Sequence, residues 1–454
     1  MFLKRLIFII FSAVMLIPSI TLADSSKSSS STKEITMSSL DAIKLAGALV
    51  DKGDFDNAET ILTGIPALNN PALEIERWFL LGQISAREGD YDTAIKIFRK
   101  ILDAQPDLAR IRFELAICYI KTKQWGHADY NLRLAMAAPD LSNEVKAMMN
   151  YYRYFIRQNK NWNIWFNFGA APDTNINNAN GGQECVMTAF GLMCRQLVNP
   201  ESAIGYNFIL GGNYEFELSE HWRWKSEGNI YTNIYDIHDY DDLYLTASTG
   251  ARYIWSKGDV WLAPTIGRRW YGWDRYNWFY GLRLDTNYDI TRKLSSGLYL
   301  RYTKNEYDLY KDILSGDTYS ANGRLSYYIN SRLYSLLRFG ATREDTVNES
   351  YSYWQPNVSI GFGAELPWGF HVYIEPSFYW TIYDGKQWVV KNDNFEESYV
   401  HDFIQRYSLS VSNNKLEFYG FVPTIIVNYT RRDSNIWQRE YDKWSIELTM
   451  QQRF

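Results

Sequence analysis

The sequence predicts a helical-repeat domain followed by a transmembrane β-barrel that fills the rest of the 454-residue chain. Three observations lead to this fold class: an N-terminal export signal, an internal repeat at helical spacing, and a long C-terminal region of alternating strands. Aromatic residues make up 17% of the chain, yet the mean hydropathy is only −0.35. This combination is typical of a barrel, in which only alternate residues face lipid and aromatic side chains gather at the membrane interfaces.

The first residues have the layout of a secretory signal peptide, predicted over residues 1–23. Basic residues precede an apolar run that ends near Ile20, and small residues come before Asp24. A membrane-spanning helix needs roughly 20 apolar residues, whereas this run is shorter and contains Pro18. We expect residues 24–38 to form a flexible polar leader. The residue immediately after the expected cleavage site is Asp24 and not a cysteine, so we expect no lipid anchor on this chain.

Residues 39–160 are predicted to form a periplasmic tetratricopeptide-repeat domain. Apolar residues recur there at helical spacing, and one unit matches the 34-residue tetratricopeptide pattern. Its signature positions are Trp78, Leu81, Gly82, Ala94, Phe98 and Pro106. Related segments lie about one period earlier, around Ala58, and one period later, around Ala128. Three consecutive units are about the minimum for a stable stack.

Three residues of the last unit are candidates for a binding face. The concave side of a tetratricopeptide stack usually grips a peptide or another protein, and Arg112, Tyr119 and Trp125 could line it. They could equally serve in packing, because the repeat pattern alone does not assign faces. We interpret Cys118 as a small buried side chain rather than a reactive thiol.

Helical periodicity ends near Asn161, and residues 161–454 are predicted to form an antiparallel barrel of about 14 strands. Between Tyr276 and Tyr288, apolar and aromatic side chains occupy one face of a strand, and Arg283 lies on the other. Arginines recur on the polar faces of several strands, which excludes a dry core. The apolar faces must therefore look into lipid and the charged faces into a wet lumen.

The connections between the strands alternate in length. Short turns are expected near Ser219, Lys257, Thr291, Asn330, Pro367 and Asn413. Longer polar loops are expected at residues 172–202 and 384–398. Six short turns join seven pairs of strands, and an even strand count puts both ends of the barrel in the periplasm with the repeats.

The last strand ends on Phe454. A terminal aromatic residue on an amphipathic strand resembles the signal read by the barrel-assembly machinery, although Gln452 breaks the alternation. We therefore expect that machinery and outer-membrane lipid to be partners of this chain.

Two loops contain residues of chemical interest. Cys185 and Cys194 lie nine positions apart in the first long loop, and in an oxidising compartment this arrangement predicts a disulfide, with two free thiols as the alternative. Residues 235–242 contain four aspartates. They could bind calcium, but a solvated acidic loop is the favoured interpretation.

No motif indicates catalysis. The five histidines lack metal-ligand spacing, and there is no HExxH, GxSxG or CxxC sequence. We therefore predict no catalytic residue, no metal, no cofactor and no enzymatic activity, while a hydrolase on the barrel wall with a single histidine stays open as a minor alternative. The net charge of −5 provides no dense basic surface, so no nucleic-acid partner is expected.

The junction between the two parts resembles the surface lipoprotein assembly modulators, the Slam family. A tryptophan-rich strand runs into a polar segment within residues 161–179. The motif positions are Pro172, Asp173, Asn175 and Asn177. The resemblance covers nearly the whole mature chain, because the family also combines a signal peptide, periplasmic repeats and a barrel. The same residues would serve equally well to cap the strand and turn the chain into its first loop.

The resemblance implies an outer-membrane translocon of type XI secretion. Its client would be a surface lipoprotein or a secreted haem- or metal-scavenging protein. The main alternative is an exopolysaccharide exporter, in which repeats also precede a barrel, but those repeat arrays are long. A passive porin or receptor is a further alternative, although it would have no obvious use for the repeats.

Overall fold

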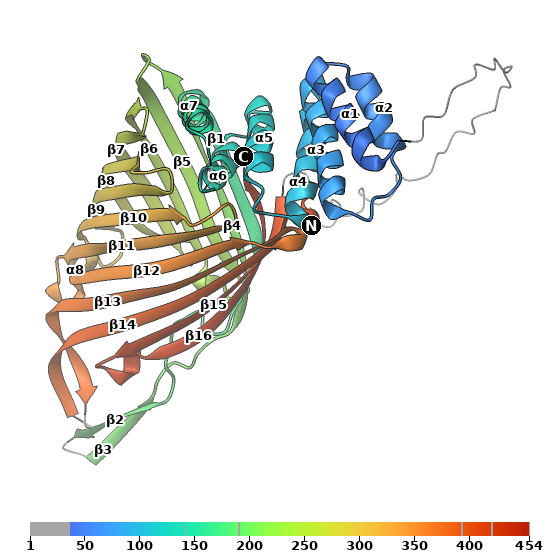
Figure 1. The fold of residues 1–454 in the computed structure, drawn as a ribbon. Helices are drawn as coiled ribbons and strands as arrows, with labels where there is room; N and C mark the ends of the chain where they lie inside the picture. Colours follow the sequence, from blue (N-terminus) through green and yellow to red (C-terminus); the bar gives the residue numbers. More distant parts are fainter. Residues whose placement is uncertain (1–36, 140, 189–190, 392–393, 419–420, 454) are drawn as a thin grey trace, which may run out of the picture.

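The computed structural model describes residues 37–139, 141–188, 191–391, 394–418 and 421–453. The predicted signal peptide, the leader up to residue 36 and the terminal Phe454 lie outside the described residues. The described chain forms a helical domain and a closed β-barrel, which meet at Lys160 and Asn161 (Figure 1). The fold class predicted from the sequence is therefore confirmed.

The helical domain consists of three hairpins and a last helix that leads into the barrel. Its helices are α1 (Ser39–Lys52), α2 (Phe55–Gly64), α3 (Pro71–Glu88), α4 (Tyr91–Ala104), α5 (Ala109–Lys121), α6 (Trp125–Met136) and α7 (Asn143–Asn159). Small residues let the helices of each hairpin cross closely, and Ala58, Ala94 and Ala128 are fully buried. A Cβ atom at Gly82 would lie 2.6 Å from the Phe98 ring, so these two signature positions touch.

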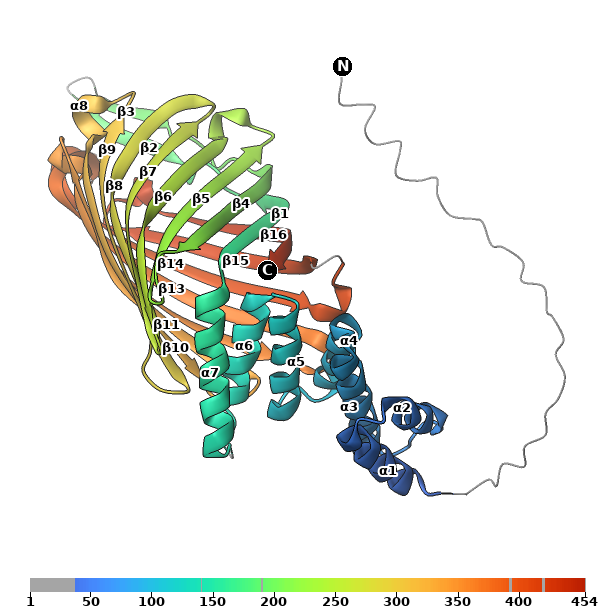
Figure 2. The same cartoon turned by 90° about the horizontal axis from the view of Figure 1, so that it is seen from above.

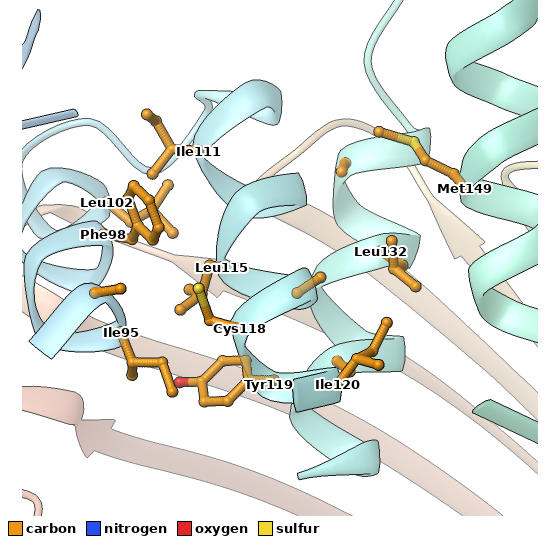
Figure 3. Packing of buried hydrophobic residues seen from close by; sticks show 14 of the residues in the cluster. Ile95, Phe98, Leu102, Ile111, Leu115, Cys118, Tyr119, Ile120, Leu132 and Met149 are labelled. Carbon is orange, nitrogen blue, oxygen red and sulfur yellow. The ribbon is translucent and has the colours of Figure 1, made fainter. Parts of the chain in front are cut away.

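The core of the helical domain runs without interruption from α3 to α7 (Figure 3). Phe98 on α4, Leu115 on α5 and Leu132 on α6 are buried in it, and Met149 extends it to α7. Gly89 ends α3 in the left-handed conformation and donates its N–H to the last turn, as glycine does at helix ends. Among the described residues, no helix has both the length and the apolar character needed to cross a membrane.

Fourteen antiparallel strands close the barrel. They are β1 (Trp162–Asp173), β4 (Ala203–Glu217), β5 (Trp222–Tyr235), β6 (Asp242–Trp255), β7 (Gly258–Tyr271), β8 (Asp274–Asp289), β9 (Leu294–Tyr307), β10 (Gly316–Tyr328), β11 (Leu333–Thr346), β12 (Tyr353–Glu365), β13 (Phe370–Lys391), β14 (Asn394–Asn413), β15 (Phe421–Ser434) and β16 (Tyr441–Arg453). Each strand pairs with its neighbours in sequence, and β1 completes the ring by pairing with both β4 and β16.

The two faces of the barrel wall differ in chemistry, as the alternation predicts. Leu262, Leu282 and Leu448 are more than half exposed on the outer face, where lipid would cover them. Inside, Arg283 donates to Glu227 at 2.9 Å. Trp261 departs from the simple pattern, because it is 1% exposed and lies on the inner face between cationic side chains.

Short and long connections lie at opposite ends of the barrel. We call the end with the connections 218–221, 256–257, 290–293, 329–332, 366–369 and 414–418 the turn end. Each short turn expected from the sequence coincides with one of these connections. We call the other end the loop end. It carries a hairpin formed by β2 (Gln183–Thr188) and β3 (Gly191–Gln196), far from the helical domain (Figure 1).

The expectation of a polar loop at residues 384–398 is wrong. Strands β13 and β14 stay paired as far as Lys391 and Asn394, with a register shift after Ile382. This extension has a small apolar core of its own, in which Val389 and Val400 are buried against Ile436 from the connection between β15 and β16. Buried apolar contacts of this kind hold a hairpin together beyond the edge of a barrel.

Candidate functional site

The helical domain is docked across the turn end of the barrel (Figure 2). The contacting side chains on α4 to α7 are those of Arg99, Arg112, Tyr130, Arg133, Arg153, Arg157 and Gln158. Their partners on the barrel are Arg223, Ser256, Asp289, Ser295, Tyr334, Glu365, Asn414 and Glu417. These partners include a residue at or beside every short connection. The domain therefore spans the mouth of the barrel instead of resting on one side of it.

Asp289, at the end of β8, is the centre of one half of this contact. Arg157 donates to it at 2.7 Å, Arg153 at 3.0 Å and Arg133 at 3.4 Å. Arg153 and Arg157 lie one turn apart on α7, so both side chains leave the same face of the helix. Asp129 on α6 accepts from Arg133 at 2.7 Å and from Arg153 at 2.9 Å. Two carboxylates thus hold three guanidinium groups between the domain and the barrel.

A groove formed by α4, α5 and α6 makes the other half of the contact. Arg112 is 1% exposed and donates to Glu365 at 2.5 Å. Arg99 donates to Glu417 at 2.5 Å and to the Asn414 carbonyl at 3.0 Å. Both carboxylates in these ion pairs come from the barrel. A cavity of about 240 Å³ remains between the groove and the barrel turns.

A short turn of the barrel reaches directly into this groove. Residues Pro367–Gly369 form a 3-10 turn between β12 and β13. Gly369 has a φ of +81°, and a Cβ atom there would lie 2.9 Å from the Asp103 carboxylate of α4. Only glycine combines this backbone conformation with so close an approach. Burial raises the pKa of Asp103 above its ordinary value.

The structure separates the three residues that the sequence offered for a binding face. Arg112 faces the barrel through Glu365. Tyr119 lines the cavity beside the groove and is buried, which raises its pKa to about 12. Trp125 packs against Phe155 in the helical core. Cys118 is buried as expected, and burial raises the pKa of its thiol to about 12.

The lumen behind this contact is polar. A cavity of about 820 Å³ lies inside the barrel, with Arg324, Arg338 and Glu447 among its lining residues. A second cavity, of about 290 Å³, is lined by Arg324 and Arg252 of the barrel and by Trp125 of α6. Because Arg324 borders both cavities, the helical domain lies directly over the lumen.

At the loop end, the first long loop folds into a disulfide-bonded hairpin. The structure joins Cys185 to Cys194 with an S–S distance of 2.01 Å. Beside the bridge, Glu184 is 5% exposed and accepts from Gln438 at 2.9 Å. Gln438 also donates to the Val390 carbonyl at 3.0 Å. The hairpin is thereby tied to the extension of β13 and β14.

The junction motif is built into the start of this loop. Asp173 accepts from the Asn175 N–H at 2.8 Å and from Lys443 at 3.0 Å. Asn175 is 2% exposed and bonds both backbone groups of Ala179. Asn177 donates to the Asn199 carbonyl and accepts from the Glu201 N–H across the loop. Pro172 is the second-to-last residue of β1. These contacts fit the capping role that the sequence left open.

The acidic segment at residues 235–242 is also internally bonded. Asp241 is 2% exposed and accepts from the Tyr235 N–H and the Trp273 indole, each at 2.7 Å. Asp242 pairs with Arg269 at 2.9 Å. Within the part of the chain that the structure describes, no group of three or more His, Cys, Asp or Glu residues is arranged to hold a metal ion.

The contact between the domain and the barrel is what sequence reasoning missed. Arg112 and Glu365 are 253 positions apart, and Arg99 and Glu417 are 318 apart. Neither carboxylate belongs to a motif. The available signal was a run of arginines on repeat helices whose partners were not apparent within the repeats themselves.

Comparison with known proteins gives a consistent result. A model of the family "surface lipoprotein assembly modifier" matches residues 162–454, and a tetratricopeptide-repeat model matches residues 85–143. A surface lipoprotein assembly modifier of Pasteurella multocida is 23% identical over 415 residues, covering 87% of this chain and 79% of that protein. Surface lipoprotein assembly modifier 1 of Haemophilus influenzae is 24% identical over 392 residues, covering 82% and 76%.

A solved bacterial polysaccharide outer-membrane secretin also aligns with this chain. The alignment covers 64% of this chain and 98% of the secretin chain, at 15% sequence identity and a TM-score of 0.32.

Proposed function

Because the chain belongs to the surface lipoprotein assembly modifier family, we propose that it moves a protein client across the outer membrane to the cell surface. This family and the closed barrel identify an outer-membrane protein with a role in transport or assembly rather than catalysis. The relatives are named for surface lipoproteins, which makes a surface lipoprotein the first candidate client. A secreted haem- or metal-scavenging protein is the second.

The docking of the repeats over the lumen is the observation that supports this proposal best. Tetratricopeptide stacks bind polypeptide, and here such a stack spans the mouth of a polar barrel. An even strand count returns both barrel ends to one side of the membrane, so we assign the helical domain, residues 39–160, to the periplasm. A client coming from the periplasm would meet the repeats before the lumen.

Deletion of the repeats tests this proposal. Removal of residues 24–155 should leave an assembled barrel, because the strands of residues 161–454 and the Phe454 terminus remain for the barrel-assembly machinery. Surface display of a lipoprotein encoded beside this gene should fall, because the client loses its docking domain. Display is measured as protease accessibility of the client on intact cells, with total client measured in lysates.

Two controls make the deletion interpretable. Heat-modifiable gel migration must show that the shortened barrel is folded, and the full-length chain must restore display. Normal display without the repeats would remove their docking role. If no neighbouring protein depends on the full-length chain, the transport proposal fails, and a polysaccharide defect in the same strain would favour the exporter instead.

A further inference from the structure

Five arginines of the helical domain face the barrel, and they fall into two groups. Arg133, Arg153 and Arg157 converge on the single carboxylate of Asp289. The groove pair, Arg99 and Arg112, instead holds one barrel carboxylate each, Glu417 and Glu365. The two groups lie on different helices, α6 and α7 for the first and α4 and α5 for the second.

The first group lies where the domain is already tethered. Helix α7 runs directly into β1 through Lys160 and Asn161, so the covalent link and the Asp289 cluster restrain the same side of the domain. The groove pair is on the other side, where no covalent link holds α4 and α5 to the barrel. If the domain moves away from the mouth, α7 is the natural hinge and the groove is the part that opens.

Within the groove pair, Arg99 lies at the water-accessible edge, whereas Arg112 and its partner Glu365 lie deeper, with side chains 1% and 15% exposed. The side chains of Arg99 and Glu417 are 25% and 30% exposed, and ion pairs near solvent exchange partners at little cost. Beside them lies the 240 Å³ cavity, which Tyr119 and Asn131 also line. The cavity therefore leaves space for an incoming acidic side chain while the barrel turns are still in place.

We propose that Arg99 and Arg112 form a receptor for an acidic segment of the exported polypeptide, and that this segment displaces Glu417 and Glu365 and so opens the mouth. The barrel turns are then a resident substitute for the client. Their chemistry indicates what the groove accepts: a carboxylate presented on a tight turn or an extended segment, one for each arginine. This inference rests on the proposed function and names the chemistry of its client contact.

The ion pair between Arg99 and Glu417 offers a matched test. Glu417→Gln and Arg99→Gln break the same contact, and a purely structural pair would respond alike to both. An exchange site responds in opposite directions. Glu417→Gln removes the resident competitor and leaves the receptor, whereas Arg99→Gln removes the receptor itself.

The measurement is binding of fluorescein-labelled hexaglutamate to the purified full-length chain in detergent, followed by fluorescence anisotropy at low ionic strength. We expect Glu417→Gln to bind the peptide about 3-fold more tightly than the unmodified chain, and Arg99→Gln about 10-fold more weakly than Glu417→Gln. Heat-modifiable migration shows that each variant is assembled. Equal binding by the two variants would overturn the proposal.

Charge-matched controls exclude a simple effect of net charge. Arg431 and Asp433 form an exposed ion pair on β15, 2.7 Å apart and far along the strand from the groove. Arg431→Gln and Asp433→Asn change the charge of the chain by the same amounts, and both should bind hexaglutamate within about 2-fold of the unmodified chain. A shift in these controls as large as in the groove variants would also overturn the proposal.

The peptide assay needs no client, which keeps this inference separate from the proposed function. Opposite responses of the groove variants, together with a repeat deletion that does not affect display, would support the receptor and refute the transport role of the repeats. A display defect on deletion, together with equal peptide binding by both variants, would support transport and refute the receptor.

Discussion

At the scale of single residues, Asp129 orders the arginines that face the barrel. It accepts from the Nε atoms of Arg133 and Arg153. Burial by itself would raise the pKa of this carboxyl, but the two guanidinium groups outweigh it and hold the pKa well below its ordinary value. Their remaining N–H groups are thereby directed toward Asp289.

Asp129→Asn should destabilise the helical domain by about 1–3 kcal/mol, because two guanidinium groups lose a charged acceptor. A carboxyl with a lowered pKa contributes its full stabilisation above the ordinary aspartate pKa of about 4 and loses it as the pH falls below that value. The difference in the free energy of unfolding between the unmodified chain and Asp129→Asn should therefore become smaller from pH 6 to pH 3. This free energy is measured by urea unfolding of the helices, followed by circular dichroism at 222 nm. A difference that does not change with pH would contradict this account.

Residue contacts within the repeats could be predicted, and those between the two parts could not. The pattern that identified Gly82 and Phe98 is local, and the two residues touch as the repeat requires. Arg112 carries no comparable signal. Its partner Glu365 becomes a neighbour only after the whole barrel has closed. Sequence reasoning therefore left its role open between binding and packing.

At the scale of elements, strand alternation predicted the barrel wall and the positions of the short turns. The prediction failed at residues 384–398, where the polar and charged residues indicated a loop. The extension of β13 and β14 depends on Val389 and Val400 meeting Ile436. That contact joins two connections that are distant in sequence, so a local pattern cannot reveal it.

The disulfide should stabilise the hairpin at the loop end, but assembly of the barrel should not depend on it. Replacing both Cys185 and Cys194 with serine should leave heat-modifiable migration unchanged, because neither residue lies in a barrel strand. A loop this short loses only about 2–3 kcal/mol of chain-entropy stabilisation, and the Glu184 to Gln438 contact would still hold the hairpin. Cleavage within residues 183–196 by added protease on intact cells should become faster.

A Glu184→Gln variant is the matched control for that hairpin, because it leaves the disulfide intact and weakens only the noncovalent contacts of Glu184 with Gln438 and Arg195. It should be cleaved more slowly than the double serine variant. Failure of the double serine variant to assemble a barrel would contradict the separation of the hairpin from the wall.

At the scale of the whole molecule, the two-part architecture was predictable, and the placement of the parts was not. Repeat spacing and strand alternation are periodic, so each reveals its own domain. The docking of α4 to α7 across the mouth depends on the shape of the closed barrel and on single ion pairs. The domain predicted as a docking domain therefore also covers the lumen.

If the helical domain must move for transport, fixing it to the rim should stop display of the client. Arg99→Cys combined with Glu417→Cys places two thiols where the native side chains meet at 2.5 Å, within reach of a short bis-maleimide. The native Cys118 should not react, because it is buried and its thiol pKa is raised to about 12. Treated cells should lose about 10-fold or more of newly displayed client, whereas untreated cells of the same strain should display it normally.

The control for this crosslink is a pair at the other end of the barrel. Arg431→Cys with Asp433→Cys, on the single strand β15, accepts the same reagent without joining the domain to the rim, and display should continue. Mass mapping of the linked peptides gives the fraction of chains locked, and the loss of display should follow that fraction. Display that persists when most chains are locked would mean that the client passes with the helical domain in place. The client would then have to leave through the barrel wall instead of the mouth.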